Sequence, residues 1–506
     1  MPRLSLPIDQ LKTHYSVVVI GSGYGGAIAA SRISRAGQQV CVLERGREFQ
    51  PGEYPDTLPE MVAETQIDSP RASVGSRTAL YDLKINDDIN VFSGCGLGGT
   101  SLVNANVSLE AEPGVLEDPR WPAALRNDAA TLLKDGYSRA REMLKPQPYP
   151  KGSPKLAKLE ALQKSAKTLG KEFYRPPINV TFKNGANHVG VEQKACVLCG
   201  DCVSGCNHSA KNTVLMNYLP DARNHGAEIF TQVGVRRLER KDGKWFVHYQ
   251  YLDSGREKFG APTLFVTADV VVVAAGVLGT AEILLRSKAA GLALSGRLGE
   301  RFTGNGDVLA FSYNGNKPID GIGFGDLPTN GRTPVGPCIT GIVDIRKQPN
   351  LDDGMVIEEG SIPGAMGGLI GPGLSATAPW AGKDLTGSAG EFFEEREREA
   401  ETFFSGPYYG AVNHTQTYLV MTHDDGAGRL VLEGDRVRIK WPGVGTQPIF
   451  KKVNDNLAAA TVPLDGVFLK NPMWSDTFNN SLTTVHPLGG CVIDRKSTRL
   501  NSSHRL

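Results

Sequence analysis

The sequence predicts a mixed α/β (α+β) fold, in which a parallel-stranded unit encloses an inserted antiparallel sheet. Three observations predict it. A buried strand, a glycine turn, a helix and a second strand follow one another over residues 15–44. Another buried strand enters a glycine turn at residues 269–276. From about 309 to 474 the chain changes to short, separated apolar runs, which are typical of an antiparallel sheet.

The first unit has the pattern of a nucleotide-binding fold. Residues 15–20 form an apolar, β-branched run with the profile of a fully buried strand. Residues 24–35 carry small and apolar side chains at helical spacing, and Gly37 supplies a stop signal. A second strand, 39–43, ends in Glu44. These elements predict a Rossmann-like unit.

The turn between the first strand and the helix carries a G-x-G-x-x-G pattern. Gly21 allows the tight turn, Gly23 lets the backbone approach a pyrophosphate, and Gly26 permits close contact of helix and sheet. Glu44 is placed to accept a hydrogen bond from an adenosine ribose. We therefore predict a dinucleotide site made by Gly21, Gly23, Tyr24, Gly25, Gly26 and Glu44.

A second glycine run, Gly94–Gly99, has a different context. The residues after it, 100–107, lack helical periodicity, and no strand-terminal acid follows about 20 residues on. This is not a second nucleotide fold, so a reductase with separate FAD and NADH folds is disfavoured. We interpret the segment as a loop whose backbone N–H groups face a flavin ring.

Four motifs together resemble the glucose-methanol-choline (GMC) oxidoreductases, and within them the cholesterol oxidase-like branch. They are Val18–Gly23 with Glu44, Gly96–Asn104, Ala274–Leu285 and Thr484–Cys491. The resemblance runs from about residue 15 to residue 493. It implies a Rossmann-like FAD-binding domain with an inserted antiparallel-sheet substrate domain. It also implies FAD-dependent oxidation of an alcohol to a carbonyl, with a 3-hydroxysteroid such as cholesterol as a candidate substrate.

The resemblance also implies further cofactor-binding residues and a division of the chain. The cofactor residues are Gly98, Gly99, Thr100, Ser101, Asn104, Asn106, Val107, Val233, Ala275 and Gly276. The division is 14–308 for the FAD-binding domain with a cysteine-rich insertion at 190–215, 309–478 for the substrate-binding domain, 479–494 for the return to the FAD domain, and 495–506 for a non-native tail.

Several shorter elements are predicted inside these domains. Antiparallel strands are expected at 230–233, 245–251 and 263–266, and a helix is expected from Thr280 to Ser287. Residues 360–390 are rich in Gly, Ser, Pro and Ala, which predicts either a lid or a surface loop.

Two residues are the predicted catalytic pair. Histidine suits removal of a hydroxyl proton because its pKa lies near neutrality, and His486 aligns with the family histidine over the flavin. His423 is the competing candidate, although it lies beside acids at a strand end. Glu358 resembles the glutamate that faces the steroid hydroxyl in cholesterol oxidases. Because Glu358 and Glu359 are adjacent in a strand, only one of them can enter the cavity.

Four of the eight cysteines suggest a metal site. Cys196, Cys199, Cys202 and Cys206 have the C-x2-C-x2-C-x3-C spacing of bacterial four-iron ferredoxins, although Asn207 replaces the usual proline. A 4Fe-4S cluster, disulfides and free thiols all remain alternatives, and zinc ranks lower because it normally joins two separated cysteine pairs. A cluster would offer reduced flavin an electron exit and would favour a dehydrogenase over an oxidase.

The C-terminus departs from the resemblance. Family members continue past the His-Pro-Leu-Gly-Gly segment with an acid near the flavin and an asparagine that completes the catalytic pair. Here residues 495–506 are polar and show no strand or helix period, so we interpret them as a non-native tail on a truncated chain. Two alternative functions follow: an inactive flavin- or metal-binding shell, and a dehydrogenase of a non-steroid alcohol that uses an Fe-S cluster.

Composition limits the partners. The 506 residues, 40% of them hydrophobic, exceed the usual size of one domain and can bury a large core. The net charge of +1 gives no field for steering nucleic acid. We expect a small-molecule alcohol and oxygen or another electron acceptor as partners, and no nucleic acid. Residues 1–14 lack an apolar signal region, and we expect no membrane span and a cytoplasmic location.

Overall fold

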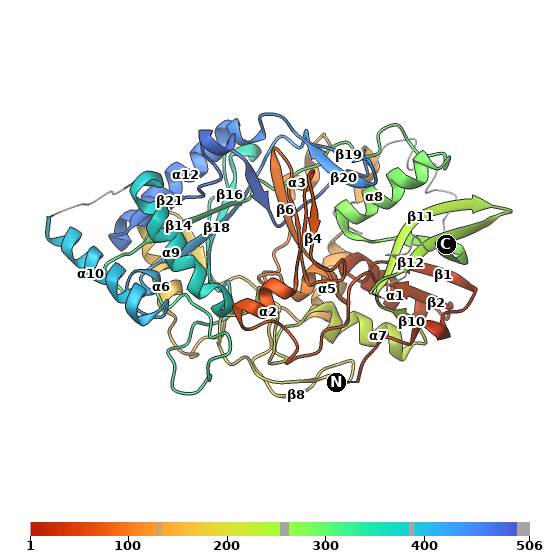
Figure 1. Cartoon of the computed structure of the whole chain (residues 1–506), viewed down its shortest axis with the longest axis horizontal. Helices are drawn as coiled ribbons and strands as arrows, with labels where there is room; N and C mark the ends of the chain where they lie inside the picture. Colours follow the sequence, from red (N-terminus) through yellow and green to blue (C-terminus); the bar gives the residue numbers. More distant parts are fainter. Residues whose placement is uncertain (1, 129–130, 132, 254–262, 384–388, 493–506) are drawn as a thin grey trace.

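The computed structural model describes residues 2–128, 131, 133–253, 263–383 and 389–492. Three sheets lie along the long axis of the molecule (Figure 1). The sheet with β1 and β2 lies at the right, the sheet with β14, β16 and β18 lies at the left, and the sheet with β4 and β6 lies between them. No helix within these described ranges is both long and apolar enough to cross a membrane.

The first sheet has six strands in the order β10-β2-β1-β13-β12-β11, of which the first four are parallel. The strands are β10 (Glu228–Phe230), β2 (Val40–Leu43), β1 (His14–Ile20), β13 (Leu264–Val273), β12 (Lys244–Tyr251) and β11 (Val233–Lys241). Its helices are α1 (Tyr24–Arg35), α7 (Tyr218–Asn224) and α8 (Gly276–Ala289).

The side chains of β1 explain why its sequence is apolar throughout. Val17 and Val19 lie in the cluster that contains the buried alanines of α1 and α7, whereas Val18 and Ile20 lie in the cluster that contains Ile283 of α8. Because successive side chains of a strand point to opposite faces, helices on both faces require apolar residues at every position. The predicted Rossmann-like α/β class is confirmed.

Three predicted boundaries in this unit are wrong. The predicted antiparallel strand 230–233 is divided between β10, which ends at Phe230 and is parallel to β2, and β11, which begins at Val233. The runs 263–266 and 269–276 belong to one strand, β13, which pairs with β1 from Thr267 to Val273 and with β12 at its other end. Thr267 and Ala268, which lie between the two runs, pair with both neighbouring strands, so the strand is not interrupted there. Helix α8 begins at Gly276 and not at Thr280.

The second sheet is antiparallel and has seven strands in the order β17-β21-β14-β18-β16-β15-β7. They are β17 (Gly382–Lys383), β21 (Val467–Lys470), β14 (Val308–Tyr313), β18 (Gln416–Thr422), β16 (Met355–Gly360), β15 (Ile342–Asp344) and β7 (Glu172–Tyr174). Helices α6 (Ala157–Leu169) and α12 (Pro448–Thr461) pack on the face that carries Ala310 and Tyr418. The short helix α11 (Gly410–Asn413) packs on the other face.

The predicted lid or surface loop at 360–390 is wrong for most of its length. Gly364–Ala381 is the helix α9, and Leu374 of this helix packs against Tyr313 and Leu469 of the sheet. Burial against the sheet outweighs the low helix propensity of its glycines and prolines. Residues 384–388 lie outside the described ranges, and α10 (Ala389–Ser405) follows them.

The third sheet brings the C-terminal motif to the N-terminal glycine loop. Its order is β22-β6-β5-β3-β4, and β22 runs parallel to β6, with Thr484 paired to Val91. The strands are β22 (Leu482–Thr484), β6 (Ile89–Gly94), β5 (Tyr81–Lys84), β3 (Thr65–Asp68) and β4 (Ser73–Val74). The remaining strands and α-helices are α2 (Leu58–Ala63), α3 (Pro113–Glu117), α4 (Ala123–Asp128), α5 (Lys134–Leu144), β8 (Gly185–Ala186), β9 (Glu192–Gln193), β19 (Arg429–Glu433) and β20 (Arg436–Lys440).

A buried ion pair fixes the register of β16. Lys158 of α6 and Glu359 are both fully buried, and the Lys158 Nζ donates to the carboxylate at 3.0 Å. The same carboxylate accepts the backbone N–H groups of Thr340 at 2.7 Å and Gly341 at 2.8 Å. Glu359 therefore points toward α6, and its neighbour Glu358 points to the opposite face of the sheet.

We expect Lys158→Met to lower the free energy of unfolding by roughly 3–5 kcal/mol, because it leaves the buried Glu359 carboxylate without its cation. Guanidinium chloride denaturation followed by circular dichroism measures the change. The matched control is Lys451→Met, which breaks the exposed Lys451–Asp455 pair and should change stability by less than about 0.5 kcal/mol. Equal losses of unfolding free energy in the two variants would contradict a stabilising role for the buried ion pair between Lys158 and Glu359.

Candidate active site

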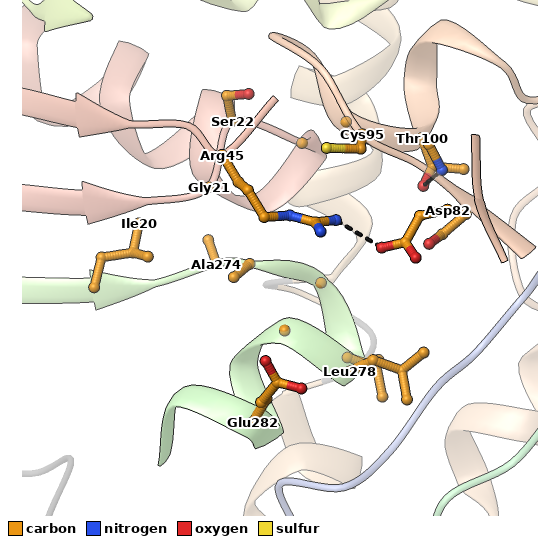
Figure 2. Close-up of a pocket in the computed structure, with 18 of the residues that line it drawn as sticks. Ile20, Gly21, Ser22, Arg45, Asp82, Cys95, Thr100, Ala274, Leu278 and Glu282 are labelled. Atoms are coloured by element: carbon orange, nitrogen blue, oxygen red, sulfur yellow. Dashed lines mark hydrogen bonds and ion pairs between the residues drawn. The ribbon is translucent and has the colours of Figure 1, made fainter. Parts of the chain in front are cut away.

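A cavity of about 520 Å³ lies where the first and third sheets meet. Its walls come from the ends of β1 and β13, from the start of α8, and from the segments around Cys95 and Thr100 (Figure 2). The carboxyl ends of parallel strands form one side, which is the place where open α/β sheets bind their ligands. His486 lines the same cavity.

The glycine turn after β1 leaves no room for side chains at two positions. Gly21 has a φ of +92°, and a Cβ atom there would lie 2.5 Å from the carbonyl oxygen of Ala274. A Cβ on Gly26 would lie 2.0 Å from the Gly21 carbonyl oxygen. Gly23 and Gly25 also line the cavity, and a Cβ on either would meet no atom closer than 3.9 Å. Gly21 and Gly26 are therefore closely packed against neighbouring backbone, whereas Gly23 and Gly25 leave open space on the cavity side.

Ser22 and Glu44 join the two glycine segments, and sequence reasoning missed Ser22. The Ser22 hydroxyl donates to Glu44 Oε2 at 2.6 Å and accepts the Gly98 N–H at 2.9 Å. The other oxygen of Glu44 accepts the Gly46 N–H at 2.7 Å. Glu44 still lines the cavity, and a carboxylate that accepts these bonds retains lone pairs for a ribose hydroxyl.

The second glycine segment divides into residues that line the cavity and residues that support it. Gly99 and Thr100 line the cavity. Gly98 and Ser101 lie behind them, and the Ser101 hydroxyl donates to the Gly98 carbonyl at 2.7 Å. These residues belong to a short 3-10 helix, Gly99–Leu102, with Gly98 at its start in the left-handed region.

The predicted cofactor-binding residues at the end of this segment pack behind the cavity wall. Asn104 donates to the Tyr24 hydroxyl at 2.9 Å, and Val107 forms a backbone bridge with Ile178. Asn106 is fully buried with a φ of +74°, and its side-chain amide has no hydrogen-bond partner among the described residues. None of Asn104, Asn106 and Val107 is part of the cavity wall.

A buried lysine that sequence reasoning did not single out holds this segment. The Lys211 Nζ donates to the carbonyl oxygens of Leu102 at 3.0 Å, Asn104 at 2.6 Å and Cys202 at 2.9 Å. Burial lowers the pKa of Lys211 to about 8. Three carbonyls satisfy the three N–H bonds of the ammonium group, so the segment and the cysteine-rich region share one anchor.

Val233, Ala275 and Gly276 all line the cavity. The Val233 N–H donates to the Glu44 carbonyl at 2.8 Å, which places Val233 beside the end of β2. Ala275 is the N-cap of α8, and Gly276 has a φ of +68°. The N-termini of α1 and α8 both face the cavity, and their partial positive charges favour an anionic ligand there.

Cationic side chains complete the wall. Arg45 donates to the Asp82 carboxylate at 2.6 Å, as Figure 2 shows. Arg77 is different, because its buried Nε has no hydrogen-bond partner in the part of the chain that the structure describes. Burial and the nearby guanidinium groups of Arg436 and Arg236 lower the pKa of Arg77 to about 10. An anionic group in the cavity would supply the missing acceptor.

His486 is held by a carboxylate from the start of β14. Its Nδ1 lies 2.9 Å and 3.0 Å from the two carboxylate oxygens of Asp307. Burial alone lowers the pKa of His486, but the hydrogen bond and charge of Asp307 outweigh it, and the pKa lies above its ordinary value. His423, the competing candidate, is not part of the cavity wall.

Glu358 is buried in β16 and lies outside the cavity wall. Its Oε1 has no hydrogen-bond partner among the residues that the structure describes. Burial raises the pKa of Glu358 well above the ordinary value, and the carboxylates of Glu359 and Asp307 raise it further. Both effects favour the neutral form of Glu358, and its Oε1 is available to a partner.

The four-cysteine run does not have the geometry of a metal-ion site. None of the eight cysteines, which all lie in the described ranges, forms a disulfide. Within those ranges no group of three or more His, Cys, Asp and Glu side chains is arranged to hold a metal ion. The backbone contacts of this region, such as the bridge between Cys199 and Gly336, instead join it to the loop before β15. Burial raises the pKa of Cys196 and of Cys199, and the thiols of Cys202 and Cys206 raise it further, so the four side chains lie near one another. The cluster and the free thiols both stay predictions.

Comparison with known proteins decides the family. The family model described as GMC oxidoreductase matches residues 17–303. The chain belongs to the GMC oxidoreductase family. It is 26% identical to the cholesterol oxidase of Mycobacterium tuberculosis, over 96% of this chain and 82% of that protein. It is 25% identical to a long-chain-alcohol oxidase of Arabidopsis thaliana, over 62% of this chain and 39% of that protein.

A solved structure shows the same GMC fold. The pyridoxine 4-oxidase from Mesorbium loti superposes with a TM-score of 0.52 and 16% sequence identity, covering 95% of this chain and 90% of that chain. GMC oxidoreductases bind FAD, and the cavity fits this cofactor in three respects. The glycine turn lets a ligand approach the backbone closely, and the N-termini of α1 and α8 face the cavity. The Nε of Arg77 has no hydrogen-bond acceptor among the described residues.

We expect Arg77→Met to raise the Kd for FAD about tenfold or more, because a charged hydrogen bond contributes about 1.5–3 kcal/mol. Titration of the apoprotein with FAD, followed by flavin fluorescence, measures the change. Arg240→Met is the matched control, because Arg240 stacks on Trp245 and is not part of the cavity wall. A Kd that is unchanged in Arg77→Met would show that this guanidinium does not contact the cofactor.

Proposed function

We propose that this chain is an FAD-dependent alcohol oxidoreductase that converts a C–OH group to a carbonyl. We further propose a 3-hydroxysteroid as the substrate and oxygen as the electron acceptor. The observation that carries the proposal is the position of His486, which lines the same cavity as the glycine turn. Alcohol oxidation needs a base that can reach the substrate hydroxyl beside the flavin ring of the cofactor.

His486 is the proposed base. The Asp307 carboxylate can only accept a hydrogen bond, so it favours the tautomer that carries its proton on Nδ1. Nε2 then has the free lone pair that takes the hydroxyl proton of the substrate. FAD, when bound, supplies the acceptor for the hydride that leaves the carbinol carbon. Asp307 stabilises the imidazolium that results.

Glu358 is the proposed second contact to the substrate hydroxyl. Its carboxyl is buried and incompletely hydrogen-bonded, and burial favours its neutral form, which can donate to or accept from a hydroxyl without the cost of a buried charge. After burial and Glu359, the charge of Asp307 also raises the pKa of Glu358, which supports a role for this acid beside the dyad formed by Asp307 and His486. In this role Glu358 orients the alcohol and His486 removes its proton.

The sheet face that carries Glu358 supports an apolar substrate. Leu309 of β14 is 41% exposed, although its strand lies inside the sheet between β21 and β18. Its cross-strand partner Leu419 and the nearby Met421 are only half-buried, and Leu419 is also the partner of Glu358. We propose that this face, within a substrate-binding domain of residues 309–478, receives the apolar body of the alcohol.

The names of two relatives also favour an apolar alcohol as the substrate. The relative that covers most of this chain is a cholesterol oxidase, and another is a long-chain-alcohol oxidase. Both names describe oxidases that act on water-insoluble alcohols. The word oxidase also favours oxygen as the acceptor for this chain.

The experiment that tests the proposal is anaerobic mixing of the FAD-loaded protein with cholesterol, a long-chain alcohol or an aryl alcohol. Bleaching of the flavin absorbance by cholesterol, followed by peroxide formation on admission of oxygen, is the expected result. Bleaching only by the long-chain or the aryl alcohol would assign the substrate to that class in place of the 3-hydroxysteroids. Bleaching with reoxidation only by an added dye would indicate a dehydrogenase. Bound FAD without bleaching by any alcohol would support the inactive shell.

We expect Glu358→Gln to keep kcat/KM within about tenfold, because an amide replaces a carboxyl that is already neutral. Glu358→Leu removes the polar contact and should lower kcat/KM by about a hundredfold. The exposed Glu433, which pairs with Lys440, provides the control Glu433→Gln. Loss of all activity in Glu358→Gln would show that an ionised carboxylate is required.

We expect the rate to rise with pH, because His486 accepts a proton only in its neutral form. The raised pKa of His486 places the rising limb of kcat/KM above pH 6.5, where an ordinary histidine would titrate. His486→Gln should lower kcat by about 10²–10⁴-fold and abolish the limb. A rising limb that persists in His486→Gln would assign the base to another residue.

A further inference from the structure

Asp307 links the substrate sheet, at the start of β14, to the segment that carries His486. It follows the tight turn Gly304–Gly306 and precedes the first residue of β14, which lies inside the substrate sheet. Its side chain is 3% exposed. A buried carboxylate costs several kcal/mol unless charges or hydrogen bonds compensate it, so its partners show what the position requires.

All three donors to Asp307 come from one consecutive segment. The Thr484 hydroxyl donates at 2.9 Å, the Val485 N–H at 2.8 Å, and the His486 Nδ1 lies 2.9 Å away. One carboxylate therefore fixes both the backbone that carries the histidine and the plane of its ring. The Thr484 hydroxyl also accepts the His486 N–H at 2.9 Å, which closes the segment on itself.

A second carboxylate fixes the turn that carries Asp307. Asp424, which follows the end of β18, accepts the N–H groups of Gly304 at 2.9 Å and Gly306 at 3.1 Å. Gly306 has a φ of +59°, and a Cβ there would lie 2.5 Å from the Thr422 side chain. The turn thus has little freedom, and β14 and β18 together determine where the Asp307 carboxylate lies.

We propose that Asp307 is the positioning residue of His486, fixing the tautomer with the proton on Nδ1 and the ring plane against the cavity. This role rests on the proposed function of His486 as base. In the reaction the hydroxyl proton moves from the substrate oxygen to Nε2, Asp307 takes up no proton, and no oxidant beyond the bound cofactor is needed. The Nδ1 proton remains on the ring throughout, so the dyad gains one positive charge that Asp307 balances.

The ionisable groups around this dyad are few. Glu358 from β16 is affected by Asp307, and Asp424 lies behind the turn. Burial raises the pKa of both carboxyls. Neither donates a proton to or accepts one from the imidazole in the described structure, so the hydrogen bond between Asp307 and His486 is the interaction to test.

The test measures the proton on His486 directly and does not need turnover. Histidine labelled with ¹³C and ¹⁵N is incorporated into the full chain, and the His486 signal is assigned by its loss in His486→Gln. We expect the nitrogen shifts of neutral His486 to report a proton on Nδ1 and its pKa to lie above that of exposed histidines. In Asp307→Asn we expect the pKa to fall and the Nδ1 tautomer to lose its preference.

Two further variants separate positioning from packing. Asp307→Glu retains the charge and should recover part of the pKa shift, whereas Thr484→Val removes a neighbouring hydroxyl and should leave the pKa raised. Equal pKa changes in Thr484→Val and Asp307→Asn would overturn the proposal, because a general loss of packing would then explain both. An unchanged His486 tautomer and pKa in folded Asp307→Asn would overturn it as well.

The loaded enzyme gives an independent measurement. We expect Asp307→Asn to lower kcat by about 10²–10⁴-fold and to move the rising limb of kcat/KM to lower pH, with KM changed much less. A structural defect alone would lower activity without moving the limb. If the pKa falls in the NMR experiment but no alcohol bleaches the flavin even in the unchanged protein, the proposed function fails and the positioning role stands.

Discussion

The rest of the cavity depends on the hydroxyl group of Ser22. It is a donor to Glu44 and an acceptor from Gly98 at the same time, so it joins the end of β2 to the second glycine segment through a single oxygen atom. Ser22 is fully buried between these partners. A hydroxyl is the smallest side-chain group that can do both, and the glycines on either side let the backbones come close enough to meet it. Together with the hydrogen bond from Asn104 to the Tyr24 hydroxyl, this junction fixes the separation of the two glycine segments.

The structure also shows how one short strand gives two adjacent acids opposite properties. Glu358 and Glu359 are both buried, but Glu359 faces a lysine and two backbone N–H groups, whereas Glu358 faces the side of the sheet where Leu309 and Leu419 lie. One acid forms an ion pair and is fully bonded, whereas burial favours the neutral form of the other, which keeps one oxygen without a partner among the described residues. The alternation of the strand makes this difference, and the buried ion pair prevents the strand from slipping by one residue, which would exchange the two environments.

Sequence reasoning succeeded where the signal is local. The glycine turn, the flanking strands and α1 lie at the predicted positions because each depends on neighbours within a few residues. It failed where a distant partner decides the outcome. Strand β13 is continuous because β1 supports it, and α9 is helical because the sheet buries Leu374. Asp307 has no local signal at all: in a Gly-Asn-Gly-Asp stretch it reads as a turn residue, and only the return of residues 484–486 reveals its partners. The roles proposed for His486 and Glu358 came from resemblance, and spacing alone would not have joined them.

Strand β7 has a consequence for the way the chain becomes a folded molecule. It comes from residues 172–174, yet it forms the edge of a sheet whose other strands span residues 308–470. In the same way, the parallel core of the first sheet needs residues 264–273 before β1 has its second neighbour. A ribosome that delivers this chain from its N-terminus therefore releases neither sheet in a finished state until most of the chain has emerged. Partly made chains expose unpaired strand edges for long periods, so folding of this protein is a late, concerted event that makes it sensitive to the supply of chaperones.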